Sequence, residues 1–170
     1  NTDTGKTVMN KELNYVIENA LQQIPIDYRM VFSLREVNGL NVLEKDLKGK
    51  KVGIIGIGTM GLLAVQCAKA YDAELVSAFD IDDRKLELAK KLGADEVHNV
   101  SGQEIEKEYG KYDIVIETSG ANPSFTLVLK LAAGKGHVLY IGTPHSTLSF
   151  EYQDFELINR KELTLKGSWM

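Results

Sequence analysis

Three glycines in the first half of the sequence stand at a spacing that can bring a backbone close to a charged ligand. Gly56, Gly58 and Gly61 directly follow a short apolar run and open a helix-like stretch. In such a strand–turn–helix unit the first glycine allows a tight turn, the second lets the backbone approach a pyrophosphate, and the third lets the helix pack against the strand. The N–H groups of Thr59 and Met60 then face the phosphates at the positive end of the helix dipole. A glycine turn that binds nothing is the alternative.

Asp80 is the next residue that could contact a dinucleotide. It lies 22 positions after the second glycine, where a carboxylate can accept hydrogen bonds from ribose hydroxyl groups. A carboxylate there would repel the 2′-phosphate of NADP, which favours NAD as the cofactor. Arg84 and Lys85 follow closely and would attract that phosphate, so NADP stays open. A purely structural alternative is a cap on the next helix, a role for which Asp82 or Asp83 is better placed than Asp80.

Short apolar runs alternate with helix-like stretches from Lys51 onward. Runs as continuous as these are typical of strands that are covered by helices on both faces. The expected strands are Val52–Gly56, Leu75–Asp80, Glu96–Val100, Tyr112–Glu117, His137–Ile141 and Leu163–Leu165. Six strands that alternate with helices predict an α/β fold, a doubly wound six-stranded parallel sheet of the Rossmann type.

Helix boundaries are marked by capping residues and glycines. Gly93 is a usual residue just past a helix end, the spacing Ser101-x-x-Glu104 is that of a capping box, and Pro123 suits a first helical turn. The expected helices are Thr59–Tyr71, Asp83–Leu92, a short one from Ser101 to about Tyr109, and one from Pro123 to about Ala133.

Small polar residues follow the carboxyl ends of three expected strands, the edge at which open parallel sheets bind their ligands. Thr118 and Ser119 follow one strand, Gly142 and Thr143 another, and Gly167-Ser168 the third. Each pair taken singly is equally well explained by a turn. Together they extend the set of candidate contacts to a dinucleotide.

Residues 1–43 have a different pattern. Apolar side chains from Leu13 to Ile24 recur at helical spacing, a second helix is expected from about Asp27 to Val37, and no strand-like run occurs. We therefore expect two parts, a helical hairpin over 1–43 and a dinucleotide-binding domain over 44–170.

The composition excludes several classes of protein. The 170 residues are 44% hydrophobic and 26% charged, as in soluble globular proteins. A net charge of −4 gives no electrostatic reason to bind nucleic acid or an anionic membrane, and no apolar run approaches the roughly 18 residues of a spanning helix. With one cysteine and no signal-like N-terminus, we expect a cytoplasmic location without an internal disulfide. A homodimer is compatible with the sequence.

No residues stand out for catalysis or metal binding. His98, His137 and His145 are not spaced at i, i+4 with a glutamate or another histidine, so neither a catalytic residue nor a metal site, zinc included, is expected. Cys67 falls among small residues of the first expected helix and suits packing better than nucleophilic attack.

From about Gly49 to Met170 the sequence resembles the coenzyme-binding domain of the zinc-dependent medium-chain alcohol and polyol dehydrogenases. The segments that carry the resemblance are residues 49–61, 80–86, 92–95 and 160–170. It implies NAD binding by Gly58 to Gly61 and Asp80, with Arg84 or Lys85 near the adenosine end. It also implies that Thr118 to Gly120 flank the adenine, and that Gly142 and Thr143 lie toward the nicotinamide. The cysteine, histidine and glutamate ligands of that family's catalytic zinc have no counterpart here.

Residues 17–42 resemble something else, the start of region 4 of extracytoplasmic-function sigma factors. That region normally continues into a DNA-recognition helix, whereas here the chain runs into the first expected strand. Residues 1–43 carry four basic and five acidic side chains, and a DNA-binding surface is usually basic. The two resemblances meeting within a few residues suggest a fused or engineered chimera.

Four hypotheses follow for function. The favoured one is an NAD(H)-binding Rossmann module of polyol dehydrogenase type, without turnover on its own because the zinc-binding catalytic domain is missing. The second is a working sugar-alcohol oxidoreductase whose catalytic groups come from a partner chain. The others are a redox-sensing DNA-binding regulator and a folding scaffold.

Overall fold

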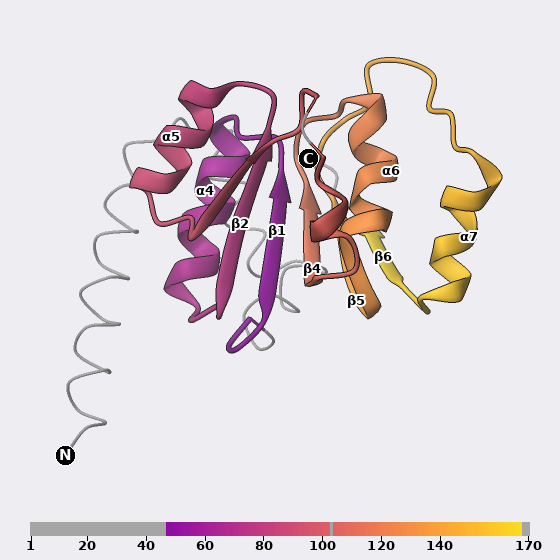
Figure 1. The fold of residues 1–170 in the computed structure, drawn as a ribbon, viewed down its shortest axis with the longest axis horizontal. Helices are drawn as coiled ribbons and strands as arrows, with labels where there is room; N and C mark the ends of the chain where they lie inside the picture. The colour runs from indigo at the N-terminus through magenta and orange to yellow at the C-terminus, as the bar shows by residue number, and fades with distance from the viewer. Residues whose placement is uncertain (1–46, 103, 168–170) are drawn as a thin grey trace. The chain divides into compact units, whose positions relative to one another are not determined.

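A computed structural model describes residues 47–102 and 104–167 of the chain (Figure 1). The expected helical hairpin over 1–43, its sigma-factor resemblance and the boundary after residue 43 lie outside the described residues. No helix in the described part of the chain has the length and apolar character needed to cross a membrane.

Six parallel strands form one sheet in the order β3-β2-β1-β4-β5-β6. The strands are β1 Lys51–Ile55, β2 Leu75–Asp80, β3 Glu96–Asn99, β4 Tyr112–Glu117, β5 Ala132–Tyr140 and β6 Thr164–Gly167. The order is that of a doubly wound Rossmann sheet, which confirms the predicted fold class. The chain starts in the middle at β1, moves to one edge and returns to the other side, so the order reverses between β1 and β4.

The central strands are buried on both faces. In β1, β2 and β4 almost every residue is out of contact with solvent, as expected for near-continuous apolar runs. Val52, Phe79, Tyr112 and Val115 are fully buried there. Both faces of each central strand pack on helices, so the carboxyl ends of β1 and β4 are held firmly in place.

Four helices cover the sheet, α4 Thr59–Ala70, α5 Asp83–Lys91, α6 Asn122–Leu131 and α7 Tyr152–Arg160. Figure 1 shows α4 and α5 beside the half of the sheet that holds β1 and β2, and α6 and α7 beside the half that holds β5 and β6. Asp82 caps α5 by accepting a hydrogen bond from the Arg84 N–H, and Pro123 lies in the first turn of α6, both as predicted.

Three expectations about the elements are wrong. The helix predicted from Ser101 to Tyr109 is only a single 3-10 turn, η2 Glu106–Glu108, because the Ser101 hydroxyl donates to Asn99 Oδ1 and caps no helix. Helix α7 was not predicted at all. Strand β5 begins five residues before the predicted His137, since it follows directly on the end of α6.

Candidate functional site

Two of the three motif glycines are required by the packing of the protein itself. Gly56 has a φ of +88°, and a Cβ on it would lie 2.6 Å from the Ser119 Cβ. A Cβ on Gly61 would lie 1.9 Å from the Gly56 carbonyl oxygen. Gly56 thus makes the turn, and Gly61 lets α4 approach the end of β1.

Gly58 differs from both, because nothing within the protein requires it. It is exposed, its φ of −89° suits any residue, and a Cβ on it would meet no atom within 4 Å. It occupies the N-cap position of α4 without a side chain that caps the helix. Thr59 and the half-buried Met60 follow in the first turn, which contains no acidic residue. The N–H groups of this turn therefore meet open space and a positive helix end.

Asp80 fixes the glycine turn against the end of β2. Its side chain is 8% exposed and accepts three backbone hydrogen bonds, from Ile57 at 2.6 Å, Ile81 at 2.8 Å and Asp82 at 2.9 Å. A carboxylate has about four acceptor positions, so about one remains for a ligand. This hold on the glycine turn was not foreseen from the sequence, which suggested a ribose contact or a helix cap for Asp80.

The Arg84 side chain is held by Asp82, which lies two residues after Asp80. The guanidinium approaches both Asp82 oxygens, with Nε 3.3 Å from Oδ1 and Nη2 3.1 Å from Oδ2. The hydrogen bond from the Arg84 side chain, followed by that from its backbone N–H, lowers the pKa of Asp82. Lys85 lies exposed beside this pair. Of the two cations that could attract a phosphate, one already has an anionic partner.

The loops that follow β1, β4 and β5 interlock through their backbones. Thr118 Oγ1 donates to the carbonyl oxygens of Ile55 and Gly56. A Cβ on Gly120, whose φ is +69°, would lie 2.2 Å from the Thr143 carbonyl oxygen, and one on Gly142 would lie 2.3 Å from the Gly120 nitrogen. The predicted contact residues of β4 and β5 are thus brought together at one edge, next to the glycine turn, and Ser119 and Thr143 are exposed there.

Glu117 is a residue of this edge that the sequence analysis missed. It is the last residue of β4 and is fully buried, although it was regarded only as the end of an apolar run. Its Oε1 accepts hydrogen bonds from the Ser119 and Gly120 N–H groups at 2.8 and 3.0 Å and from the Ser119 hydroxyl. The signal was available in the sequence, since a charged residue inside a strand buried on both faces needs partners.

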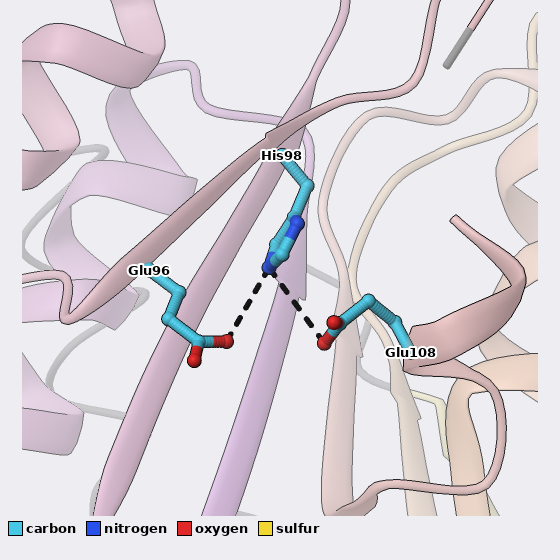
Figure 2. Close-up of side chains that lie close together, drawn as sticks. All are labelled: Glu96, His98 and Glu108. Atoms are coloured by element: carbon cyan, nitrogen blue, oxygen red, sulfur yellow. Dashed lines mark ion pairs between the residues drawn. The ribbon is translucent and has the colours of Figure 1, made fainter. Parts of the chain in front are cut away.

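A second group of titratable side chains lies away from this edge (Figure 2). Glu96 and His98 are two positions apart on β3, so they share a face of the strand, and Glu108 of η2 faces them. His98 Nε2 lies 3.4 Å from a Glu96 oxygen and 3.7 Å from a Glu108 oxygen. The sequence search tested helical spacing alone and therefore missed this group, which is the one candidate for a metal site among the described residues.

Lys111 already supplies the positive charge that a metal would bring. Its Nζ lies 2.9 Å from Glu96 Oε2 and 3.0 Å from Glu108 Oε2, and the Tyr112 hydroxyl also donates to Glu108. The hydrogen bond from Lys111 lowers the pKa of Glu96 against the effect of burial. Burial alone would raise the pKa of Glu108, but hydrogen bonds from Tyr112 and Lys111 outweigh it and lower that pKa. These residues do not fit a zinc ion while the ammonium group stands between their carboxylates.

Comparison with known proteins identifies one family. The pattern of the zinc-binding dehydrogenases matches residues 59–170. Galactitol 1-phosphate 5-dehydrogenase of Escherichia coli K12 is 39% identical over 134 residues, which cover 75% of this chain and 39% of that protein. The crystal structure of the Escherichia coli galactitol-1-phosphate dehydrogenase has a TM-score of 0.68 at 38% identity, over 73% of this chain and 38% of that one.

Another similar protein contains a bound dinucleotide. It is a zinc-binding dehydrogenase from Sinorhizobium meliloti 1021 whose structure is bound to NADP, with a TM-score of 0.66 and 28% identity over 75% of this chain and 38% of that one. The chain thus spans less than two fifths of the length of either protein.

Proposed function

This chain belongs to the zinc-binding dehydrogenase family, and we propose that its described part binds a nicotinamide adenine dinucleotide where the strand order reverses, between β1 and β4. The observation that carries the proposal is Gly58. A glycine that neither backbone conformation nor packing requires, at an uncapped helix N-terminus, is explained by a ligand that must come close to the backbone. The resemblance to zinc-dependent alcohol and polyol dehydrogenases noted from the sequence is confirmed.

The side chains and backbone groups at this edge suit the parts of a dinucleotide. The first N–H groups of α4 would bind the pyrophosphate, and the remaining acceptor position of Asp80 would bind a ribose hydroxyl. By the same proposal Ser119 borders the adenine side, and Gly142 and Thr143 border the nicotinamide side. When bound, the nicotinamide ring supplies a site for hydride transfer.

We propose NAD rather than NADP as the preferred cofactor. The Asp80 carboxylate would face a 2′-phosphate and repel it, and Arg84 is engaged by Asp82 instead of being available to that phosphate. The Sinorhizobium meliloti relative shows that members of this family can bind NADP, so the preference has to be measured.

The substrate class that we propose is a sugar alcohol or its phosphate, after the name of the Escherichia coli relative. The described residues contribute the cofactor side of that reaction. Glu96, His98 and Glu108 do not fit a zinc ion, and we propose that oxidation requires residues beyond the described ones.

Calorimetric titration with NADH and, separately, with NADPH at fixed moderate salt tests the proposal. We expect saturable NADH binding and weaker NADPH binding. The matched variant is Gly58→Val, whose side chain meets open space in the protein and should lower the melting temperature only slightly, as a poorer N-cap of α4, while it blocks the pyrophosphate. The affinity for NADH should fall by about 100-fold or more, as expected when a close backbone contact is lost. Unchanged NADH binding by this variant would place the site elsewhere, and no binding by the wild-type chain would refute the function.

A further inference from the structure

Glu117 is the fully buried carboxylate at the end of β4, and burial of such a group is costly. Its neighbours in the sheet are Ile55, the last residue of β1, and Tyr140, the last residue of β5. It therefore stands between the two strands whose loops would border the dinucleotide. An apolar residue would end a buried strand at much lower cost, so the carboxylate needs a reason to be there.

One oxygen of this carboxylate organises the loop after β4. Oε1 accepts the N–H groups of two successive residues, Ser119 and Gly120, together with the Ser119 hydroxyl. The Ser119 hydroxyl also hydrogen-bonds with Ser124 Oγ at 2.8 Å, near the start of α6. The loop is thus wound around a single acceptor atom, which fixes its position relative to the strand.

The other oxygen stands against the loop after β5. Oε2 is buried without a hydrogen-bond partner, and a Cβ on Gly142 would lie 2.3 Å from it. The Glu117 carbonyl oxygen accepts the N–H groups of Ile141 and Gly142 at 2.9 and 3.0 Å. The same residue therefore holds one loop through its side chain and the other through its backbone, with a glycine at each point of closest approach.

We propose that Glu117 is a positioning residue whose carboxylate sets the distance between loop 118–120 and loop 141–143, and with it the shape of the edge that receives the dinucleotide. This inference rests on the proposed function. Glu117 itself contacts no ligand in this proposal, because it is fully buried. The alternative is that the carboxylate only stabilises the fold.

Three variants separate these roles. Glu117→Ala removes the acceptor and should raise the Kd for NADH about 30-fold, the order expected when positioning hydrogen bonds are lost. Glu117→Gln keeps an acceptor oxygen and the size of the side chain, and should restore affinity to within about 5-fold of the wild-type value. Val115→Ala is the matched control, since Val115 is equally buried two residues earlier in β4 and touches neither loop's hydrogen bonds. It should lower the melting temperature and leave the Kd within about 3-fold.

All affinities are to be measured at a temperature at which every variant is fully folded by circular dichroism. If Glu117→Ala does not fold, Glu117→Leu replaces it, because leucine nearly keeps the volume of the side chain but offers no acceptor to the Ser119 and Gly120 N–H groups, and it should weaken NADH binding by a similar factor. The proposal is overturned if Glu117→Ala binds NADH as tightly as Val115→Ala does. It is also overturned if Glu117→Gln binds NADH no more tightly than Glu117→Ala.

Hydrogen exchange of the ligand-free protein provides a readout that does not depend on the cofactor. The Ser119 and Gly120 amides should exchange about tenfold faster in Glu117→Ala than in the wild type or in Glu117→Gln, because they lose their acceptor. If the wild-type chain binds no NADH but this difference is observed, the proposed function fails and the positioning of the loop stands. Equal exchange rates would overturn the positioning role itself.

Discussion

The two acidic groups of this domain are stabilised by different partners. At the carboxyl edge of the sheet, Asp80 and Glu117 are held by backbone N–H groups. On the side of β3 and η2, Glu96 and Glu108 are held by the ammonium group of Lys111. In both arrangements the carboxylates come from separate elements of the fold.

The difference decides what each group can still bind. Backbone amides are neutral dipoles that fix a carboxylate in place and leave its charge in the site, where it can select among ligands. A lysine cancels part of the negative charge of the two carboxylates and occupies the position that an external cation would need. The first group, Asp80 and Glu117, is therefore suited to a ligand. The second group, Glu96 and Glu108, already has its cation. The predictions below test this contrast by removing one partner at a time.

Among the changes that test this contrast, the largest effect is expected from neutralising Asp80. Asp80→Asn keeps the size of the side chain and an acceptor for the N–H groups of Ile81 and Asp82, but removes the charge and leaves the Ile57 N–H without its acceptor. We expect NADH to bind about 10-fold more weakly while NADPH changes little, so that the preference for NADH narrows. Parallel titrations of wild type and variant measure it, and an unchanged ratio of the two affinities would contradict the role of the carboxylate in cofactor choice.

The asparagine variant is a better test than alanine at this position. Alanine would leave the N–H groups of Ile57, Ile81 and Asp82 without their acceptor beside a buried strand end, at a cost of roughly 2–4 kcal/mol of stability. A loss of NADH affinity in Asp80→Ala could then arise from a disordered glycine turn as well as from the missing ribose contact. Thermal unfolding of both variants distinguishes the two effects.

An intermediate effect, on stability rather than binding, is expected at the second group. Lys111→Met leaves Glu96 and Glu108 facing each other without a cation, and should cost about 1 kcal/mol at pH 7, a value discounted because Glu96 is 40% exposed. NADH affinity should not change. Urea unfolding of the two proteins measures the difference, and a drop in NADH affinity would show that the two groups are not independent.

The pH dependence of this difference follows from the pKa shifts. The folded-state pKa values of Glu96 and Glu108 lie below their ordinary values, so the stabilisation is complete above about pH 5 and is lost as pH falls through the folded-state values. Lys111 has a raised pKa, so its contribution is complete at neutral pH and is lost only as pH rises through the folded-state value. Wild type and Lys111→Met should therefore converge in stability as pH falls through the folded-state pKa values of the two glutamates. Equal stabilities at pH 7 would contradict the ion-pair assignment.

The same contrast explains how far the sequence could predict this protein. The bounds of β2 and β4 were predicted correctly, because each is a short, mostly apolar run with polar residues on both sides of it. The glycine turn was located through its spacing. Glu117 was missed because its partners are backbone amides of the next turn, and the residue types of a turn do not show which acceptor its amides bind. The group around Lys111 was missed because it joins β3 to η2, two elements whose proximity depends on the tertiary fold.

Local signals also failed where tertiary contacts replaced them. The capping-box spacing from Ser101 to Glu104 predicted a helix, but the Ser101 side chain and backbone N–H both bind Asn99. Asn99 is in turn held by Asp83 of α5. A capping box needs a free serine hydroxyl, so it does not form when a nearby acceptor already binds that hydroxyl. The consequence is a single 3-10 turn in place of a helix.

The smallest effect is expected from releasing Arg84 at the edge of the first group. Asp82→Asn keeps an oxygen for the N-cap of α5 but removes the anionic partner of the guanidinium, which is then available to a 2′-phosphate. NADPH affinity should rise about 2- to 3-fold and NADH affinity should stay constant, because an exposed ion pair contributes little. Asp83→Asn is the matched control, with the same charge change at a residue whose partner is Asn99. If both variants gain NADPH affinity equally, the effect is one of net charge, and if Asp82→Asn still gains it when Arg84 is replaced by alanine, the guanidinium has no part in it.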